Sequence, residues 1–317
     1  MSGPLLMTYV LPWVGKGNQL YSGQFTTVQL VSDSTNLWSG LLFQIAKHWI
    51  AGETYEEAMK RAERTNSSNL LAIINLLGEE VTAYDEAAAA TAEYLEILKT
   101  FKTRKVRGCI SVKPTQLGLT IDRKLYEENM KSILSTAESL NTFVWIDMEG
   151  SRYTTDTVDS YLEMLKRFDN VGVAIQAYLK RSNEDVQKIL DSKGIIRLVK
   201  GAYKENATIA FKRKRQINEN FSKLMGLMFE RGNRFAIATH HEKLIEEAAE
   251  LSKRRPADFE FEMLMGIRDA KKLELAQRGF QISEYIPYGK GWWAYSVRRI
   301  QEHKSNILLL ARSLISG

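Results

Sequence analysis

Cysteine is nearly missing from this chain: its 317 residues include one, Cys109. An intrachain disulfide needs two cysteines, so the fold must be stabilised without covalent cross-links, and a reducing compartment is expected. Cys109 lies inside an apolar segment. We therefore interpret it as a core residue and not as a nucleophile.

Long hydrophobic runs and targeting signals are also lacking. No window approaches the roughly 18 to 20 apolar residues that a membrane-spanning helix needs. The first seven residues, Met-Ser-Gly-Pro-Leu-Leu-Met, have neither the basic start nor the small-residue cleavage site of a secretory signal. We therefore expect a soluble cytoplasmic protein.

The charge balance gives little support for a nucleic-acid partner. The formal net charge is +6 and the pI is about 9.1, but 44 basic residues are spread among 38 acidic ones. The dense basic cluster is the segment 212–215, Lys-Arg-Lys-Arg. We interpret the excess as a solvated surface together with a site for an anionic ligand, and we expect no nucleic-acid binding.

From residue 69 onward, short apolar runs alternate with amphipathic helical segments. The runs are rich in Val, Ile and Leu and cover 70–77, 107–113, 143–147, 171–177, 195–200, 235–239, 259–264 and 281–286. Strands that are buried on both faces have this pattern, and β–α alternation requires a parallel sheet. Eight such units predict an α/β fold of the closed (β/α)8, TIM-like type. An open doubly wound sheet is the alternative, but no G-x-G-x-x-G motif follows any run, so a Rossmann site has no support.

The first 65 residues do not share this rhythm. An apolar helical pattern over 37–50 and the capping-box spacing of Thr54-Tyr-Glu-Glu57 predict helices there. We expect an N-terminal helical arm over 1–65 and a catalytic barrel over 66–317. A final helix over 293–314 is expected to lie over the barrel mouth, where its neighbours Arg298 and Arg299 suit bidentate capture of a carboxylate.

Polar side chains stand at the ends of the predicted strands, which is where barrels of this kind place their chemistry. Turn chemistry alone would favour Gly, Asn, Asp or Ser at such positions. The Lys, Arg, Gln and Tyr found in or at the ends of these runs are not turn residues, and the full set is Glu79, Lys113, Asp147, Gln176, Arg197, Lys200, Thr239, His240, Glu262 and Tyr285. The sequence therefore predicts a functional site at the barrel mouth.

Cations inside apolar runs are the most informative of these residues. Arg197 needs an ionic partner or a polar cavity, and Asp147 is the expected partner. A purely structural ion pair that closes the barrel is the alternative interpretation. Lys113 equally suits a Schiff-base lysine, and Lys200-Gly201 suits close approach to a phosphate. Neighbouring His240 and His241 point to opposite faces of a strand, so we expect no metal site.

Nine segments, in order, resemble the proline dehydrogenase family, in particular its short monofunctional bacterial and archaeal members. The segments are 76–79 (LLGE), 111–118 (SVKPTQLG), 146–149 (IDME), 174–181 (AIQAYLKR), 196–203 (IRLVKGAY), 238–240 (ATH), 259–261 (FEF) with Gly266, 285–289 (YIPYG) and 295–299 (YSVRR). The intact IRLVKGAY segment makes the resemblance specific. It covers about residues 70 to 315 and leaves the first 65 unmatched.

The resemblance implies FAD bound non-covalently at the barrel mouth and oxidation of L-proline to Δ1-pyrroline-5-carboxylate by hydride transfer to flavin N5. The electrons would then pass to a quinone, which implies possible peripheral contact with the inner face of a membrane through 37–50 or 307–310. A homo-oligomer is left open. We also keep open another cyclic imino acid such as hydroxyproline as substrate, a lysine-dependent barrel lyase acting through Lys113 or Lys200, and a non-catalytic flavin- or anion-binding module.

Carried over residue by residue, the resemblance assigns roles to the mouth residues. Lys113, Arg298 and Arg299 would hold the proline carboxylate, Tyr285 and Leu264 would pack on the ring, and Asp147 would position Lys113 and Arg197. Glu79 would pair with Arg298 and close the site. Arg197 would lie beside flavin N5, and the remaining cofactor contacts would be Gln176, Val199, Lys200, Gly201, Ala202, Lys214, Thr239, His240 and Glu262. Glu262 departs from the family, which commonly has Gln there.

Overall fold

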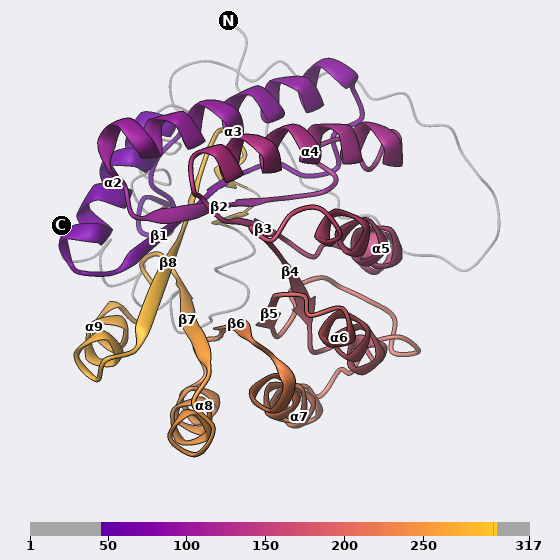
Figure 1. Cartoon of the computed structure of the whole chain (residues 1–317), viewed down its shortest axis with the longest axis vertical. Helices are drawn as coiled ribbons and strands as arrows, with labels where there is room; N and C mark the ends of the chain where they lie inside the picture. The colour runs from indigo at the N-terminus through magenta and orange to yellow at the C-terminus, as the bar shows by residue number, and fades with distance from the viewer. Residues whose placement is uncertain (1–45, 294, 297–317) are drawn as a thin grey trace, which may run out of the picture. The chain divides into compact units, whose positions relative to one another are not determined.

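The computed structural model describes residues 46–293, 295 and 296. In this part of the chain, eight parallel strands form a closed barrel in which consecutive strands pair and β8 pairs with β1 (Figure 1). The strands are β1 (Leu71–Leu76), β2 (Gly108–Val112), β3 (Val144–Ile146), β4 (Val171–Gln176), β5 (Ile196–Val199), β6 (Arg234–Ala238), β7 (Asp258–Leu264) and β8 (Gln281–Tyr288). The helices between them are α3 (Tyr84–Arg104), α4 (Arg123–Ser139), α5 (Thr154–Leu165), α6 (Ser182–Asp191), α7 (Lys214–Arg231), α8 (Glu242–Arg254) and α9 (Asp269–Gln277).

The predicted (β/α)8 barrel is confirmed, and the open sheet is excluded because β1 and β8 pair along six residues. Every strand begins and ends within two residues of its predicted run. The reason is burial on both faces: β4, for example, has no exposed residue along its whole length. Such strands keep an apolar pattern that stands out from the surrounding helices.

Side chains alternate between the outside and the inside of the barrel, as the pleat of a strand requires. On β5, Ile196 and Leu198 join the main core that packs against the helices, while Arg197 points inward between them. A smaller apolar cluster includes Cys109 and Trp145, and Cys109 is buried as predicted. Along each strand, the side chains that point into the barrel are therefore two residues apart in the sequence.

Helix α2 (Tyr55–Ser67) fills the outer layer between β8 and β1 and packs against both strands (Figure 1). Its predicted capping box is confirmed, since Thr54 and Glu57 bond reciprocally at its start. The boundary between an arm over 1–65 and a barrel over 66–317 stays a prediction. Most of the helices expected over 37–50 and 293–314 lie outside the described residues.

No helix in the described part of the chain is both long enough and apolar enough to cross a membrane.

A buried carboxylate on the outer face of β8 ties two helices to the barrel. Glu284 is 1% exposed and accepts hydrogen bonds from Arg61 Nη2 and Thr65 Oγ1 on α2, both at 2.7 Å. Lys272 Nζ on α9 donates to it at 2.7 Å. Burial opposes ionisation of Glu284, but the charges of Lys272 and Arg61 outweigh it and lower its pKa.

Replacing Glu284 with alanine is expected to cost about 3–5 kcal/mol in the free energy of unfolding, because Lys272 and Arg61 lose their buried counter-charge. Urea unfolding at neutral pH measures the effect, and the cost should shrink in acid as the wild-type carboxylate becomes protonated. The control is Asp159→Ala, which removes an exposed ion pair with Lys188 and should cost less than about 1 kcal/mol. Equal costs for both variants would contradict the assignment.

Candidate active site at the barrel mouth

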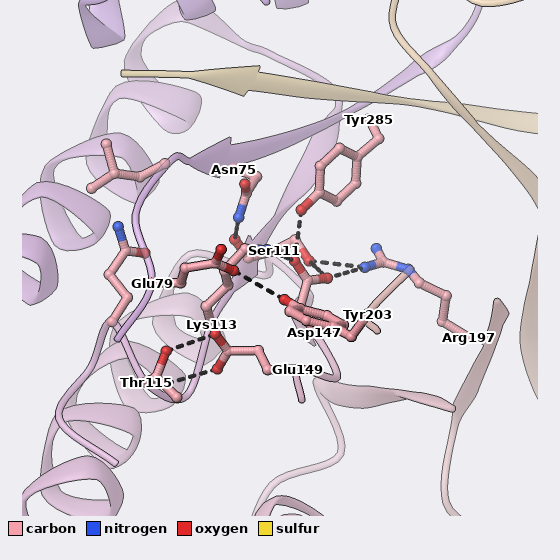
Figure 2. A network of polar contacts seen from close by, with 12 residues as sticks. Asn75, Glu79, Ser111, Lys113, Thr115, Asp147, Glu149, Arg197, Tyr203 and Tyr285 are labelled. Atoms are coloured by element: carbon pink, nitrogen blue, oxygen red, sulfur yellow. Dashed lines mark hydrogen bonds and ion pairs between the residues drawn. The ribbon is translucent and has the colours of Figure 1, made fainter. Parts of the chain in front are cut away.

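Asp147 is the centre of a polar network at the carboxyl ends of the strands (Figure 2). It follows β3, and its carboxylate accepts four side-chain hydrogen bonds. The donors are Ser111 Oγ at 2.7 Å, Lys113 Nζ at 2.6 Å, Arg197 Nη1 at 2.9 Å and Tyr285 OH at 2.6 Å. The structure thus brings three predicted site residues, Lys113, Arg197 and Tyr285, onto the carboxylate of a fourth, Asp147.

The charges in this network support one another. Burial disfavours ionisation of Asp147, but Lys113 and Arg197 outweigh it and lower the pKa of Asp147 to about 2. Burial likewise disfavours the Lys113 ammonium, yet the Asp147 carboxylate raises the pKa of Lys113 well above its ordinary value. All three groups are therefore ionised at neutral pH, and together they carry one net positive charge that suits an anionic ligand.

Arg197 is held on several sides inside the barrel. Its guanidinium carbon lies 4.5 Å from the centre of the Trp145 ring and 5.6 Å from that of Tyr285. Its Nε lies 2.5 Å from Glu262 Oε2, although the two atoms are not aligned as a hydrogen bond. Its Nη2 is buried and has no hydrogen-bond partner within the described part of the chain. Since buried N–H groups normally have an acceptor, Nη2 marks a place for a ligand atom.

The β5–β6 side of the mouth is basic. Lys200 follows β5 and donates to Asn218 Oδ1 on α7 at 2.6 Å. Burial, with the nearby charge of Lys214, lowers the pKa of Lys200 to about 8. The first N–H groups of α7 and α8 receive no side-chain cap from the residues that precede these helices. Uncapped helix N-termini beside two lysines can bind a phosphate group.

The other predicted cofactor residues lie around the same mouth. Gln176 ends β4 and donates from Nε2 to the Glu149 carbonyl oxygen at 2.9 Å, and His240 Nε2 accepts from Leu264 N at 3.0 Å. Gly201 has a φ of +106°, and a side chain there would collide with the Tyr178 ring. The remaining members are Val199, the last residue of β5, Ala202, which is exposed in the following loop, and buried Thr239 after β6.

Glu79 bonds across the mouth to the loop after β5. Tyr203 OH donates to Glu79 Oε2 at 3.0 Å, which joins the loops that follow β1 and β5 (Figure 2). The expected partner, Arg298, lies outside the described residues, as does Arg299. Of the predicted carboxylate clamp, the structure therefore describes Lys113.

Glu149 connects three loops of the mouth. It is 2% exposed and accepts from Thr115 N at 2.8 Å and Thr115 Oγ1 at 2.6 Å, while Thr115 Oγ1 accepts from Glu80 N at 2.7 Å. The three loops are those after β1, β2 and β3, and they carry Glu79, Lys113 and Asp147. Burial raises the pKa of Glu149 to about 7.

Glu149→Gln should remove a pH dependence of stability. Because the folded-state pKa of Glu149 is raised, its stabilising contribution is complete below about pH 4.5 and is lost as the pH rises through about 7. Relative to the variant, we expect the wild type to lose about 2–3 kcal/mol in the free energy of unfolding between pH 5 and pH 8. Urea unfolding at both pH values measures this difference. A wild-type-to-variant difference that is the same at both would contradict the raised pKa.

Several residues of the network were given no role from the sequence alone. Glu149 lies in the loop after β3, where strand alternation does not apply. Ser111 lies two positions before Lys113, and Trp145 lies two positions before Asp147, so these two share a face with a predicted residue. The alternation of strand side chains was the signal that could have found them. Tyr203 lies in a loop, where no periodicity marks it.

Within residues 46–293, 295 and 296, no cluster of three or more His, Cys, Asp or Glu side chains could hold a metal ion.

Known proteins resemble this sequence over most of its length. A family model described as proline dehydrogenase matches residues 58–311. The chain belongs to the proline dehydrogenase family. Members of this family that resemble it include Proline dehydrogenase 1 of Bacillus subtilis subsp. natto, 37% identical over 273 residues that cover 85% of this chain and 90% of that protein. Proline dehydrogenase of Deinococcus radiodurans is 28% identical over 308 residues, which cover 95% of this chain and 99% of that one.

Solved structures share the barrel. Proline utilization A (PutA) from Bdellovibrio bacteriovorus matches with a TM-score of 0.80 and 23% identity, over 86% of this chain and 34% of that chain. PutA from Corynebacterium freiburgense matches with a TM-score of 0.72 and 24% identity, over 87% and 33%. The chain thus spans about a third of the length of these structures. At this level of identity, the likeness shows the fold alone.

Proposed function

We propose that the chain is an FAD-dependent proline dehydrogenase, which oxidises L-proline to Δ1-pyrroline-5-carboxylate and passes the electrons to a quinone. Its family supports an oxidoreductase that acts on proline. The observation that carries the proposal is the Asp147 network, in which Lys113, Arg197 and Tyr285 meet on one carboxylate. In this arrangement, Lys113 is a fixed cation that can bind a substrate carboxylate, and Arg197 is a second fixed cation beside it.

The donor set at the mouth fits a flavin dinucleotide. The buried Nη2 of Arg197, which has no hydrogen-bond partner among the described residues, suits an acceptor atom of the ring system. Lys200 and Lys214, beside two helices without a side-chain N-cap bond, suit a pyrophosphate. When bound, without a covalent link, FAD would supply a two-electron acceptor that takes a hydride at N5. We assign the remaining cofactor contacts to Gln176, Val199, Gly201, Ala202, Thr239, His240 and Glu262.

The chain's own residues would act mainly by binding and orientation. Lys113 binds the proline carboxylate through its ammonium group, and we place Arg298 and Arg299 with it in this role. Tyr285 and Leu264 contact the ring and set its orientation. Holding the substrate Cα–H in a near-attack geometry is the main source of rate enhancement for a transfer that needs no nucleophile.

Asp147 and Arg197 would have distinct electrostatic roles. Asp147 holds Lys113, Arg197 and Tyr285 in fixed relative positions through hydrogen bonds of 2.6–2.9 Å. Cationic Arg197 then stabilises negative charge that develops next to it during the reaction. Glu79, bonded to Tyr203, closes the mouth by joining the loops after β1 and β5, which lie on opposite sides of the barrel.

The charge state of Lys113 argues against a lysine-dependent lyase. A Schiff-base lysine must be neutral to attack a carbonyl, whereas Asp147 keeps Lys113 protonated. Lys200 has a lowered pKa of about 8, so it is the lysine on which that alternative depends. Borohydride treatment in the presence of substrate tests it, and a trapped adduct on Lys200 or Lys113 would overturn the dehydrogenase proposal.

Steady-state rates with L-proline and with 4-hydroxyproline test the substrate. The Tyr285 hydroxyl donates its one proton to Asp147 at 2.6 Å, so it cannot also donate a hydrogen bond to a ring hydroxyl group. We therefore expect a higher kcat/KM for L-proline. An equal or higher value for hydroxyproline would move the proposal to that imino acid.

The quinone acceptor implies a contact with the membrane surface. We place this peripheral contact in 37–50, of which 46–50 are described, or in 307–310, which lies outside the described residues. Sedimentation with liposomes, with oxidised and with proline-reduced protein, tests it. Binding that increases on reduction is the expected result, and no binding in either state would remove the membrane contact from the proposal.

A further inference from the structure

Glu262 is a carboxyl group buried inside the barrel. It lies on β7, its side chain is 2% exposed, and its Oε2 is 2.5 Å from Arg197 Nε. Neither of its oxygens has an aligned hydrogen bond with any described residue. Asp147, the other carboxylate on Arg197, accepts four. Since aligned donors stabilise the ionised form, Asp147 stays charged, and Glu262 is the member of this pair that takes up a proton.

The charges around Glu262 act in the same direction. Glu260 lies two residues earlier on the same face of β7 and accepts hydrogen bonds from Ser283 Oγ and from Gln281 Nε2. Its negative charge opposes a second one on Glu262. The titratable or charged groups from other elements around this part of the interior are Cys109 on β2, Asp147 after β3, Arg197 on β5, Arg234 on β6 and Tyr285 on β8. His240, after β6, accepts a hydrogen bond from Leu264 N at the end of β7.

We propose that Glu262 is a positioning residue for Arg197 that exchanges a proton inside the barrel, so that its protonation state sets the net charge which Arg197 presents to the ligand at the mouth. This inference rests on the proposed function, in which Arg197 lies beside the flavin. With Glu262 ionised, the guanidinium is flanked by two carboxylates. With Glu262 protonated, Asp147 alone balances it, and that carboxylate is shared with Lys113.

The sign of the effect follows from burial. Burial raises the pKa of Glu262 to about 8, although the charge of Arg197 acts to lower it. Glu262 is therefore neutral below this pH and negative above it. The positive field of Arg197 at the mouth should be strong at pH 6 and weakened at pH 9. The lower pH should therefore favour the reduced, more negative flavin, and this effect adds to that of the flavin's own proton uptake.

Glu262→Gln separates charge from positioning, because the amide keeps the size and an acceptor for Arg197 Nε but cannot ionise. Glu260→Gln is the matched control, two residues away on the same face. The first measurement is an infrared titration of the carboxyl groups without added substrate. We expect the wild type to show a carboxyl that titrates near pH 8, Glu262→Gln to lack it, and Glu260→Gln to retain it at a lower pH.

The second measurement is the midpoint potential of bound FAD against pH. Wild type and Glu262→Gln should agree at pH 6, where Glu262 is already neutral. At pH 9 the variant should favour the reduced flavin roughly tenfold more, which corresponds to about 30 mV for a two-electron couple. Glu260→Gln should leave Glu262 able to titrate and should therefore follow the wild type at both ends of this range.

Two results would overturn the inference. One is a Glu262 carboxyl that titrates in the ordinary glutamate range; the other is a potential difference between wild type and Glu262→Gln that is the same at pH 6 and pH 9. A chain that binds no FAD would instead overturn the proposed function. The infrared titration does not require the flavin, so it still decides whether Glu262 exchanges a proton.

Discussion

Replacing Asp147 with alanine is expected to lower kcat/KM for L-proline about 1,000-fold and to cost about 3–5 kcal/mol in the free energy of unfolding. The carboxylate is the common acceptor for Ser111, Lys113, Arg197 and Tyr285. Its removal leaves two buried cations next to each other without this counter-charge. Steady-state kinetics at saturating FAD and urea unfolding measure the two effects.

The Asp147→Asn variant distinguishes charge from shape. The amide keeps the size of the side chain, but the pKa of Lys113 should fall, because burial then acts on the ammonium without the carboxylate. KM for L-proline should therefore rise with pH in the variant at values where the wild type is constant. Asp191→Ala, which removes an exposed partner of Arg231, is the control and should change neither quantity. An Asp147→Ala enzyme with near-normal kcat/KM would show that the network only closes the barrel.

Replacing Lys113 with alanine is expected to raise KM for L-proline roughly 100-fold while the affinity for FAD is unchanged. A charge-assisted hydrogen bond to a carboxylate in a buried site contributes on the order of 1.5–3 kcal/mol. Asp147 holds Lys113 Nζ in place at 2.6 Å, and the variant loses this positioned ammonium group. Initial rates over a wide range of proline concentrations, together with flavin content, measure the effect.

Lys188→Ala is the control for this prediction, because Lys188 is an exposed lysine that pairs with Asp159 on the outside of the barrel. It should leave KM and kcat as they are in the wild type. If Lys113→Ala lost its flavin and kept its KM for proline, Lys113 would belong to the cofactor site. If it kept both, the proposed carboxylate clamp would be wrong.

The barrel could be predicted from the sequence because burial on both faces requires nearly continuous apolar residues in each strand. β4 has six consecutive buried residues and no polar position until Gln176 at its end. Arg197 within β5 needed a partner for the same reason, and the expected ion pair with Asp147 is present at 2.9 Å. Both inferences depend on a single physical rule, the cost of burying unpaired polar groups.

Contacts that depend on loop conformation could not be predicted in this way. The bond between Tyr203 and Glu79 joins the loops after β1 and β5, which are far apart in sequence, and no periodicity marks either residue. The same holds for Thr115, whose hydroxyl receives Glu80 N–H and donates to Glu149. Glu262 was visible as an unusual acid, but its lack of aligned donors is a property of the packed interior.

The visible absorption spectrum of the FAD-loaded protein, recorded before and after anaerobic addition of L-proline, tests the central claim most directly. The proposed function predicts oxidised flavin bands that bleach when proline is added, with Lys188→Ala behaving as the wild type and Lys113→Ala bleaching only at much higher proline concentration. Flavin bands that persist at saturating proline would contradict proline as the substrate. A protein that cannot be loaded with FAD would contradict the proposal as a whole.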